Sequence, residues 1–156
     1  MRVINEEILR NRMDRIVELE QTQKATWIQF NFSRYVKCVE FPIESFLTLR
    51  NFELNFKVYT AFHDEAIPDS EVIRFLKTLC ISPFLQFFKL VTTHKMGTNW
   101  IKKQLKLDVK KAKNVEKNVK QYWTSDEKEV FEIVFNKKKI TMERKEYVPE
   151  PEFEDL

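Results

Sequence analysis

Apolar and polar residues follow two different periods in the first part of the chain. Residues 5–22 carry apolar side chains at helical spacing, which predicts an amphipathic helix. Its apolar positions are Ile4, Ile8, Leu9, Met13, Ile16 and Val17. From Ile28 to Phe32 and again from Phe52 to Val58, every second residue is apolar, which is the period of a β-strand. A polar helix end therefore runs almost directly into a strand.

Two more helical segments and a third strand follow. Residues 42–47 begin with Pro42, which suits the first turn of a short helix. The segment IPDSEVIRFLKTLCISP predicts a longer helix that Asp69 or Ser70 would cap and that Pro83 would end. The aromatic run FLQFFKLV predicts the third strand. Because helices separate these strands, we expect parallel pairing with right-handed crossovers.

The spacing of these strands suggests a repeat architecture. The strands begin near Ile28, Phe52 and Phe84, which is close to the roughly 20–35 residues of leucine-rich-type units. We therefore expect an α/β fold built as a short leucine-rich-repeat-like solenoid layer, with mostly parallel strands covered by helices.

The C-terminal half has a different pattern. The Lys-rich segment after residue 97 predicts a helix around Ile101 and Leu105, followed by a mobile connection. Residues 131–142 alternate on both sides of Asn136-Lys137, which predicts an antiparallel hairpin because Asn tolerates the positive φ of such turns. We expect residues 1–146 to form a single domain. The acidic, proline-containing residues 147–156 are expected to be a disordered tail.

Composition excludes several classes of protein. The only glycine is Gly97, so glycine-rich phosphate loops and dinucleotide fingerprints are excluded. Two cysteines, Cys38 and Cys80, are too few for a disulfide framework and are interpreted as buried thiols. The N-terminal segment carries acids where a signal peptide would be apolar, and no run approaches 18 apolar residues. We expect an intracellular protein, cytoplasmic or nuclear, with no membrane contact.

The strongest local charge is a run of lysines. The net charge of the chain is only +3, so nucleic-acid binding would need a local basic patch. The patch comprises Lys102, Lys103, Lys106, Lys110, Lys111, Lys113, Lys117 and Lys120. It could bind phosphate backbone through counterion release. A solvated surface is the simpler interpretation because the patch lacks arginine and interleaved aromatic residues, and the acidic tail could offset it.

No catalytic or metal site is predicted. His63 and the two acids that follow it resemble a fragment of a metal or acid–base site, but the only other histidine is His94. A triad of Cys80, His94 and Asp69 can be assembled on paper, yet Cys80 lies on the apolar face of its helix and should be an inert thiol. We expect no cofactor.

Aromatic residues provide the candidates for protein binding. The three tryptophans, Trp27, Trp100 and Trp123, are expected to be mostly core residues. Tyr35, Tyr59 and Phe62 lie just outside predicted strands and are the better candidates for exposed binding anchors.

Four segments together resemble the FTH domain of nematode F-box proteins. They are IVELEQTQKATWIQF, FPIESFLTLRNFELNF, SEVIRFLKTLCISPFLQFFKL and VFEIVFNKKKITMERK, and the resemblance covers residues 12–146. The LEQ of residues 19–21, Ala25 and the FEI of residues 131–133 match the family pattern. Thr22 stands where the family usually has tryptophan, and Phe88 where cysteine is common.

The resemblance implies a role in target recognition. In that family the domain follows an F-box, which docks on the Skp-type adaptor of a cullin ubiquitin ligase, and the FTH region is thought to recognise the target protein. The segment before the LEQ motif leaves no room for an F-box, so we expect either a solitary recognition domain or a truncated relative. In both cases we expect a non-enzymatic interaction domain with an unknown target and no Skp-type adaptor binding. The alternative is a nucleic-acid-associated protein that binds through residues 102–120. An enzyme is the least favoured class.

Overall fold

The computed structural model describes residues 6–24, 26–32, 41–56 and 66–149. Within them, seven strands form an open mixed sheet in the order β1-β2-β3-β7-β6-β5-β4. The strands are β1 Ile28–Phe32, β2 Asn51–Phe56, β3 Phe87–Thr92, β4 Lys111–Glu116, β5 Val119–Trp123, β6 Glu129–Asn136 and β7 Lys139–Glu146. The helices are α1 Glu6–Glu18, α2 Glu20–Lys24, the 3₁₀ helix η1 Ile43–Phe46, α3 Asp69–Cys80 and α4 Thr98–Asp108.

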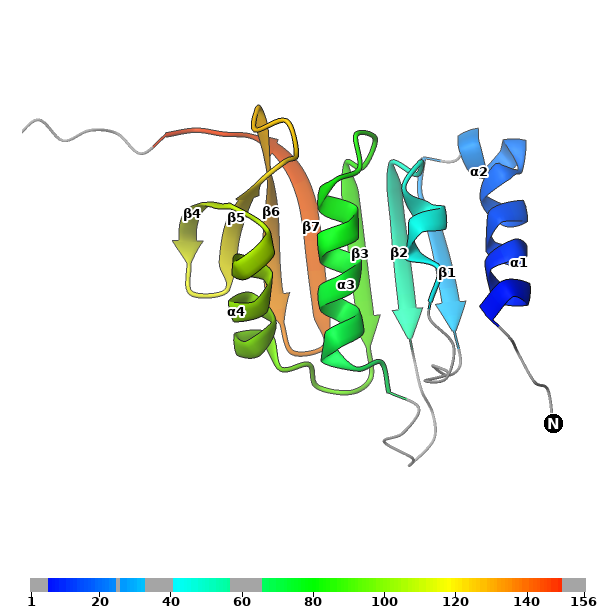
Figure 1. The fold of residues 1–156 in the computed structure, drawn as a ribbon, viewed down its shortest axis with the longest axis horizontal. Coiled ribbons are helices and arrows are strands. Elements are labelled where there is room, and N and C mark those ends of the chain that lie inside the picture. Colours follow the sequence, from blue (N-terminus) through cyan, green and yellow to red (C-terminus); the bar gives the residue numbers. More distant parts are fainter. Residues whose placement is uncertain (1–5, 25, 33–40, 57–65, 150–156) are drawn as a thin grey trace, which may run out of the picture.

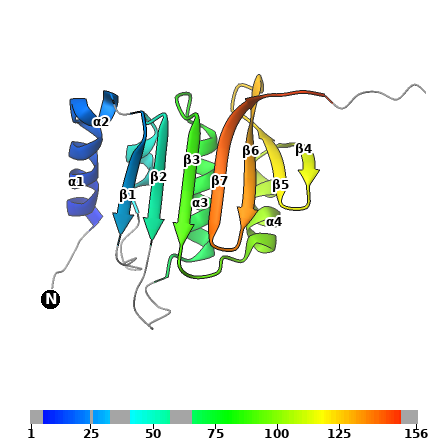
Figure 2. The same cartoon turned by 180° about the vertical axis from the view of Figure 1, so that it is seen from behind.

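The helices that follow strands cover one face of the sheet. α3 and α4 lie in front of the strands in Figure 1, and the view from behind in Figure 2 shows the strands in front of them. α1 lies beside β1 at one edge, and the β4–β5 hairpin forms the other edge (Figure 1). The fold is therefore an α/β layer with one helix-covered face.

The first three strands pair in parallel, as predicted. β2 lies between β1 and β3, and Phe52 of β2 is the register partner of Ile28 and Phe88. Phe52, Leu54 and the residues of β1 and β3 that pair with them pack into the core under the helices. The Phe52 ring also lies 5.3 Å from the ring of Phe46 in η1. Each such buried ring stabilises the fold by about 1.5–3 kcal/mol.

Helix α3 lies in the predicted segment, but it begins at Asp69 and its start is not capped as expected. The N-cap position is Pro68, and the Asp69 carboxylate instead accepts a hydrogen bond from the backbone N–H of Gly97, at 3.1 and 3.2 Å. A Cβ atom at position 97 would lie 2.6 Å from Asp69 Oδ2. The single glycine of the chain therefore occurs where a carboxylate of α3 approaches the backbone that starts α4.

The expectation of a mostly parallel sheet is wrong. β7 pairs with β3 in antiparallel orientation, and the pairs β7–β6, β6–β5 and β5–β4 are antiparallel as well. Four of the six pairings are thus antiparallel. Alternation in the sequence predicted the β6–β7 hairpin, but it carries no information about which strand that hairpin joins, and β7 extends the sheet by pairing with β3.

The predicted mobile connection after α4 is also wrong, because residues 111–123 form the β4–β5 hairpin. β4 is an edge strand without a fully buried residue, so it shows no apolar alternation. In β5 only Gln121 and Tyr122 are buried. Lysines on an edge strand are a common protection against pairing with another chain. Because lysines replace the apolar residues that would alternate in a buried strand, the sequence pattern did not predict β4.

The reason given for the β6–β7 turn is wrong as well. Asn136 pairs with Lys139, so the two-residue loop is Lys137–Lys138. Among the described non-glycine residues, only Glu127 has a positive φ, of 57°. The hairpin is where the sequence predicted it, but the turn does not use a left-handed asparagine.

The long N-terminal helix is divided into two. α1 ends at Glu18 and α2 begins at Glu20, so Leu19 lies between them. The backbone N–H of Leu19 donates to the carbonyl of Ile16 at 3.3 Å, an i to i−3 contact that tightens the end of α1. Met13 and Val17 are buried, whereas Leu19 is exposed. The predicted range 5–22 is therefore two helices that meet at an exposed leucine.

Arg144 of β7 joins the two halves of the sheet. Its side chain is 8% exposed, and its Nε and Nη2 atoms donate to the carbonyls of Leu85 and Ser82, both at 2.7 Å. The guanidinium carbon lies 4.6 Å from the centre of the Phe131 ring. A fork of donors thus ties the last strand to the loop that connects α3 with β3.

We predict that Arg144→Ala lowers the free energy of unfolding by about 2–4 kcal/mol, because two buried carbonyls lose a charged donor. Arg144→Lys should restore only part of this, because an ammonium cannot reproduce the fork. Denaturant unfolding followed by circular dichroism measures both. Lys139→Ala, an exposed position on the same strand, is the control and should cost under about 0.5 kcal/mol. Equal costs for Arg144→Ala and the control would contradict the assignment.

Candidate functional site

Several predicted residues lie outside the described part of the chain. They are Tyr35, Cys38, Tyr59, Phe62, His63, Asp64 and Glu65. The described strands that precede these segments end at Phe32 and Phe56, which are register partners in parallel strands. The proposed anchors Tyr35, Tyr59 and Phe62 therefore stay predictions.

The eight lysines of segment 102–120 do not form one patch. Five of them, contributed by α4 and the β4–β5 hairpin, lie toward the same side of the sheet. These five, named here the five-lysine cluster, are Lys102, Lys106, Lys111, Lys117 and Lys120. The charge of the segment does not distinguish these five lysines from the other three, and only folding separates them.

Contacts between α4 and the hairpin define one end of the cluster. The Lys102 ammonium donates to the carbonyl of Lys117 and to Asn118 Oδ1, both at 3.3 Å. The same ammonium lies 6.0 Å from the centre of the Phe135 ring, a core residue of β6. Lys102 thus crosses from the helix to the hairpin turn over the helix-covered face of the sheet.

These lysines lie close enough to influence one another's titration. The pKa of Lys102 is lowered by partial burial and then by the charges of Lys120 and Lys117. The pKa of Lys111 is lowered by partial burial and then by Lys106 and Lys120. Lys120 acts on both, so it lies at the centre of the cluster.

The other three lysines have different surroundings. Lys110 forms an ion pair with Glu127 at 3.5 Å. Lys113 pairs across the hairpin with Gln121, and its ammonium donates to the carbonyl of Val148 at 3.3 Å. Lys103 lies about 100° further round α4 than Lys102 and is exposed.

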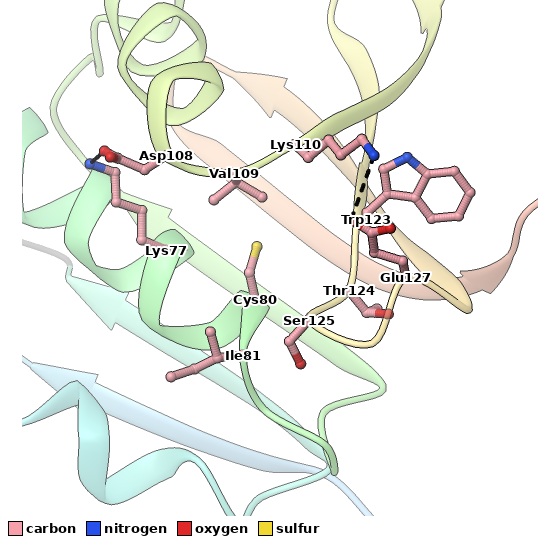
Figure 3. A pocket seen from close by; sticks show the side chains of 10 residues that line it. All are labelled: Lys77, Cys80, Ile81, Asp108, Val109, Lys110, Trp123, Thr124, Ser125 and Glu127. Atoms are coloured by element: carbon pink, nitrogen blue, oxygen red, sulfur yellow. Dashed lines mark ion pairs between the residues drawn. The ribbon is translucent and has the colours of Figure 1, made fainter.

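A small pocket lies between the C-terminal ends of α3 and α4 and the β5–β6 turn (Figure 3). Its volume is about 250 Å³, below the roughly 300–1,000 Å³ of most ligand sites. Ion pairs of Lys77 with Asp108 and of Lys110 with Glu127 lie among its lining residues. The Cys80 side chain points toward Val109 in Figure 3. The hydroxyl of the lining residue Thr124 donates to the Asp126 carboxylate at 2.6 Å.

Cys80 is buried, as predicted. Burial raises the pKa of its thiol from 9.0 to about 12, so the reactive thiolate is disfavoured. Burial also raises the pKa of Tyr122 to about 12, with a smaller contribution from Cys80. Asp69 and Cys80 lie at opposite ends of α3, about 16 Å apart at 1.5 Å per residue. The triad of Cys80, His94 and Asp69 is therefore not assembled.

The described residues contain neither a metal-binding cluster nor a membrane-spanning helix. Within those ranges, no three His, Cys, Asp or Glu side chains lie close enough to hold a metal ion together. None of the helices in the same ranges has the length and apolar character needed to cross a membrane.

Comparison with known proteins gives no assignment. No protein-family model, curated protein or solved structure matches this chain. Function is therefore inferred from the side chains of the chain itself.

Large apolar side chains are exposed at the end of the sheet where the parallel strands begin. Trp27 is 43% exposed, Ile81 59% and Phe84 47%. Trp27 directly precedes β1, and Ile81 and Phe84 lie between α3 and β3, so both segments stand where parallel strands begin. We name these three residues the apolar end.

The expectation that the tryptophans are mostly core residues is wrong for Trp27 and Trp100, which are both exposed. A signal was present in the sequence for Trp27. It is one residue before Ile28 and therefore in phase with Gln29 and Asn31, which are exposed residues of β1. Its ring packs 5.4 Å from that of Phe87 on β3. Ile81 and Phe84 flank Pro83, after the predicted helix, where periodicity makes no statement about burial.

The Cys80 thiol predicts a pH dependence of stability. Its pKa is higher in the folded protein than in the unfolded chain, so this contribution is complete below about pH 9 and is lost as the pH rises toward 12. Between about pH 8 and about pH 10.5, Cys80→Ala should therefore lose about 2 kcal/mol less stability than the wild type. Denaturant unfolding at both pH values measures this. Parallel stability curves for the two proteins would contradict the burial of a protonated thiol.

Proposed function

We propose that this chain is a non-enzymatic, intracellular protein-interaction domain, similar in role to the target-recognition region of nematode F-box proteins. The observation that carries the proposal is the apolar end, where Trp27, Ile81 and Phe84 are 43–59% exposed. Exposed apolar surface commonly marks protein contact sites, and tryptophan is enriched among residues that dominate binding energy. The partner is a protein with a complementary apolar patch.

The apolar end is held in place by the fold. The Ser82 hydroxyl donates to the carbonyl of Leu47 at 2.7 Å and accepts the backbone N–H groups of Phe84 and Leu85, each at 3.2 Å. The adjacent Gln86 and Phe87 N–H groups both donate to the Arg50 carbonyl. A loop held in this way loses little conformational freedom when it binds, which favours affinity.

Aromatic packing fixes the Trp27 side of the apolar end. The Trp27 ring rests 5.4 Å from the Phe87 ring at an interplanar angle of 44°. Trp27 directly precedes β1 and Phe87 begins β3, so the contact spans the intervening β2. Such a tilted pair adds about 0.5–1.5 kcal/mol beyond the area that it buries. The indole is therefore a positioned anchor with an exposed edge.

We further propose that the parallel half of the sheet is a leucine-rich-repeat-like layer. The order β1, η1, β2, α3, β3 alternates strands with helical segments, and successive strands are neighbours in the sheet. Units of one strand and one helix that stack side by side are typical of such architectures. In these layers the strand-end loops are a usual place for recognition.

We predict that the double variant Trp27→Ala and Phe84→Ala loses its protein partner. Crosslinking of the tagged chain in cells, followed by mass spectrometry, should identify proteins joined to peptides from residues 19–30 and 81–89 in the wild type. Recovery of those proteins should fall at least about tenfold in the variant, because two anchors worth about 1–2 kcal/mol each are lost.

The control is Trp100→Ala with Leu107→Ala on α4, since Trp100 is exposed to a similar extent, 46%. Circular dichroism establishes that both double variants are folded. The proposal is contradicted if the control loses the same proteins to the same extent, or if the crosslinks map elsewhere. A parallel triple variant, Tyr35→Ala, Tyr59→Ala and Phe62→Ala, tests the predicted loop anchors in the same way.

The second candidate function is association with nucleic acid through residues 102–120. One specific observation favours it, namely that α4 and the β4–β5 hairpin bring five lysines together. Clustered lysines release counterions when they bind phosphate backbone, which gives salt-sensitive affinity.

A further inference from the structure

We propose that the five-lysine cluster binds the phosphodiester backbone of nucleic acid without reading the bases, and that the remaining lysines of segment 102–120 take no part. This inference rests on the second candidate function. It assigns the contact to Lys102, Lys106, Lys111, Lys117 and Lys120, and it excludes Lys103, Lys110 and Lys113.

Strand register puts the hairpin lysines on the helix-covered face. Lys111 pairs with Tyr122, which is fully buried and pairs in turn with the core residue Phe131. Lys120 lies two residues before Tyr122, so it projects from the same face of β5. Both side chains therefore extend on the face that carries α4.

Helix geometry brings the α4 lysines to the same place. Ile101 and Leu105 are the residues of α4 that are buried against the sheet. Lys102 and Lys106 each follow one of these by one position and are four residues apart, so they share one flank of the helix. The contacts of Lys102 with the turn at Lys117 and Asn118 show that this flank faces the hairpin.

Among the residues that the structure describes, no acid pairs with the ammonium groups of the cluster. The Lys102 and Lys120 ammonium groups contact neutral oxygens, the latter the Glu116 carbonyl at 3.0 Å. Partial burial, and then repulsion from neighbouring lysines, lowers the pKa of Lys102 and Lys111, and a bound anion would relieve that repulsion.

The shape of the cluster favours a chain of phosphates over a single one. The lysines extend from the hairpin turn at Lys117 to Lys111 at the start of β4, a strand of six residues. At 3.3 Å per residue this is about 20 Å, which is long enough for several phosphates of one strand. A linear polyanion fits such a strip better than a compact anion does.

The chemistry of the cluster predicts backbone contact without sequence recognition. All five cations are lysines, which bind phosphate as point charges and lack the planar fork with which arginine reads guanine. Trp100 lies two residues before Lys102, about 200° round α4, and so points away from the lysine flank. Stacking of bases on an aromatic ring is therefore not built into the site.

Fluorescence anisotropy with two single-stranded oligonucleotides of about 20 nucleotides, oligouridylate and a mixed sequence, tests the inference. At about 50 mM salt the full chain should bind both within about threefold of each other, with a log–log salt slope of up to about −3.5 for five contacts. Lys106→Glu with Lys120→Glu should weaken binding at least about tenfold and flatten the slope.

The matched control is Lys110→Glu with Lys113→Glu, which changes the net charge equally within the same segment and should bind nearly as the wild type does. Equal weakening in both double variants would overturn the assignment to the cluster. A preference of more than about tenfold for one sequence would overturn base-independent binding. Displacement of the oligonucleotide by poly-glutamate at equal charge would point to an acidic protein partner and overturn the phosphate assignment.

Absence of binding to both oligonucleotides at low salt would overturn the inference together with the second candidate function. The proposed protein-interaction function would be untouched by that result, because its test uses Trp27 and Phe84 at the opposite part of the sheet.

Discussion

The pairing of β3 with β7 is the contact on which the rest of the structure depends. It joins three parallel strands to four antiparallel ones, so one sheet results where the chain could have formed two small ones. Arg144 reinforces the joint because its guanidinium donates to two carbonyls of the loop before β3 and covers the Phe131 ring. A buried cation with its donors satisfied specifies one register, since a one-residue slip would turn it to the opposite face.

This joint also decides where the two candidate surfaces lie. Because β7 occupies the free edge of β3, the β4–β5 hairpin is left at the outer edge of the sheet, beside α4. The lysines of both elements then meet there. At the other part of the sheet, the loop before β3 is held by Ser82 and Arg144, and Phe84 projects from it. The basic five-lysine cluster and the apolar end thus lie in separate regions of one sheet.

Individual residues show what could be anticipated about the sites. The burial of Cys80 followed from its place on an apolar helix face, because helical period and burial are linked directly. Trp27 alternates in phase with the exposed residues Gln29 and Asn31, so its exposure could have been predicted. Its residue type had instead suggested a core position. The different surroundings of Lys106 and Lys110 could not be anticipated, because both stand in one lysine run and only the fold gives Lys110 the partner Glu127.

The sequence by itself determined the elements with strong local periodicity: β1, η1, β2, α3, β3 and the β6–β7 hairpin. Their apolar positions recur at the period of a helix or a strand, and that is a property of neighbouring residues. Tertiary structure alone decided the β4–β5 hairpin, the pairing of β7 with β3, and the gathering of five lysines. An edge strand need not alternate, and strand partners and charge clusters join residues far apart in sequence, so their energies depend on contacts that no local pattern records.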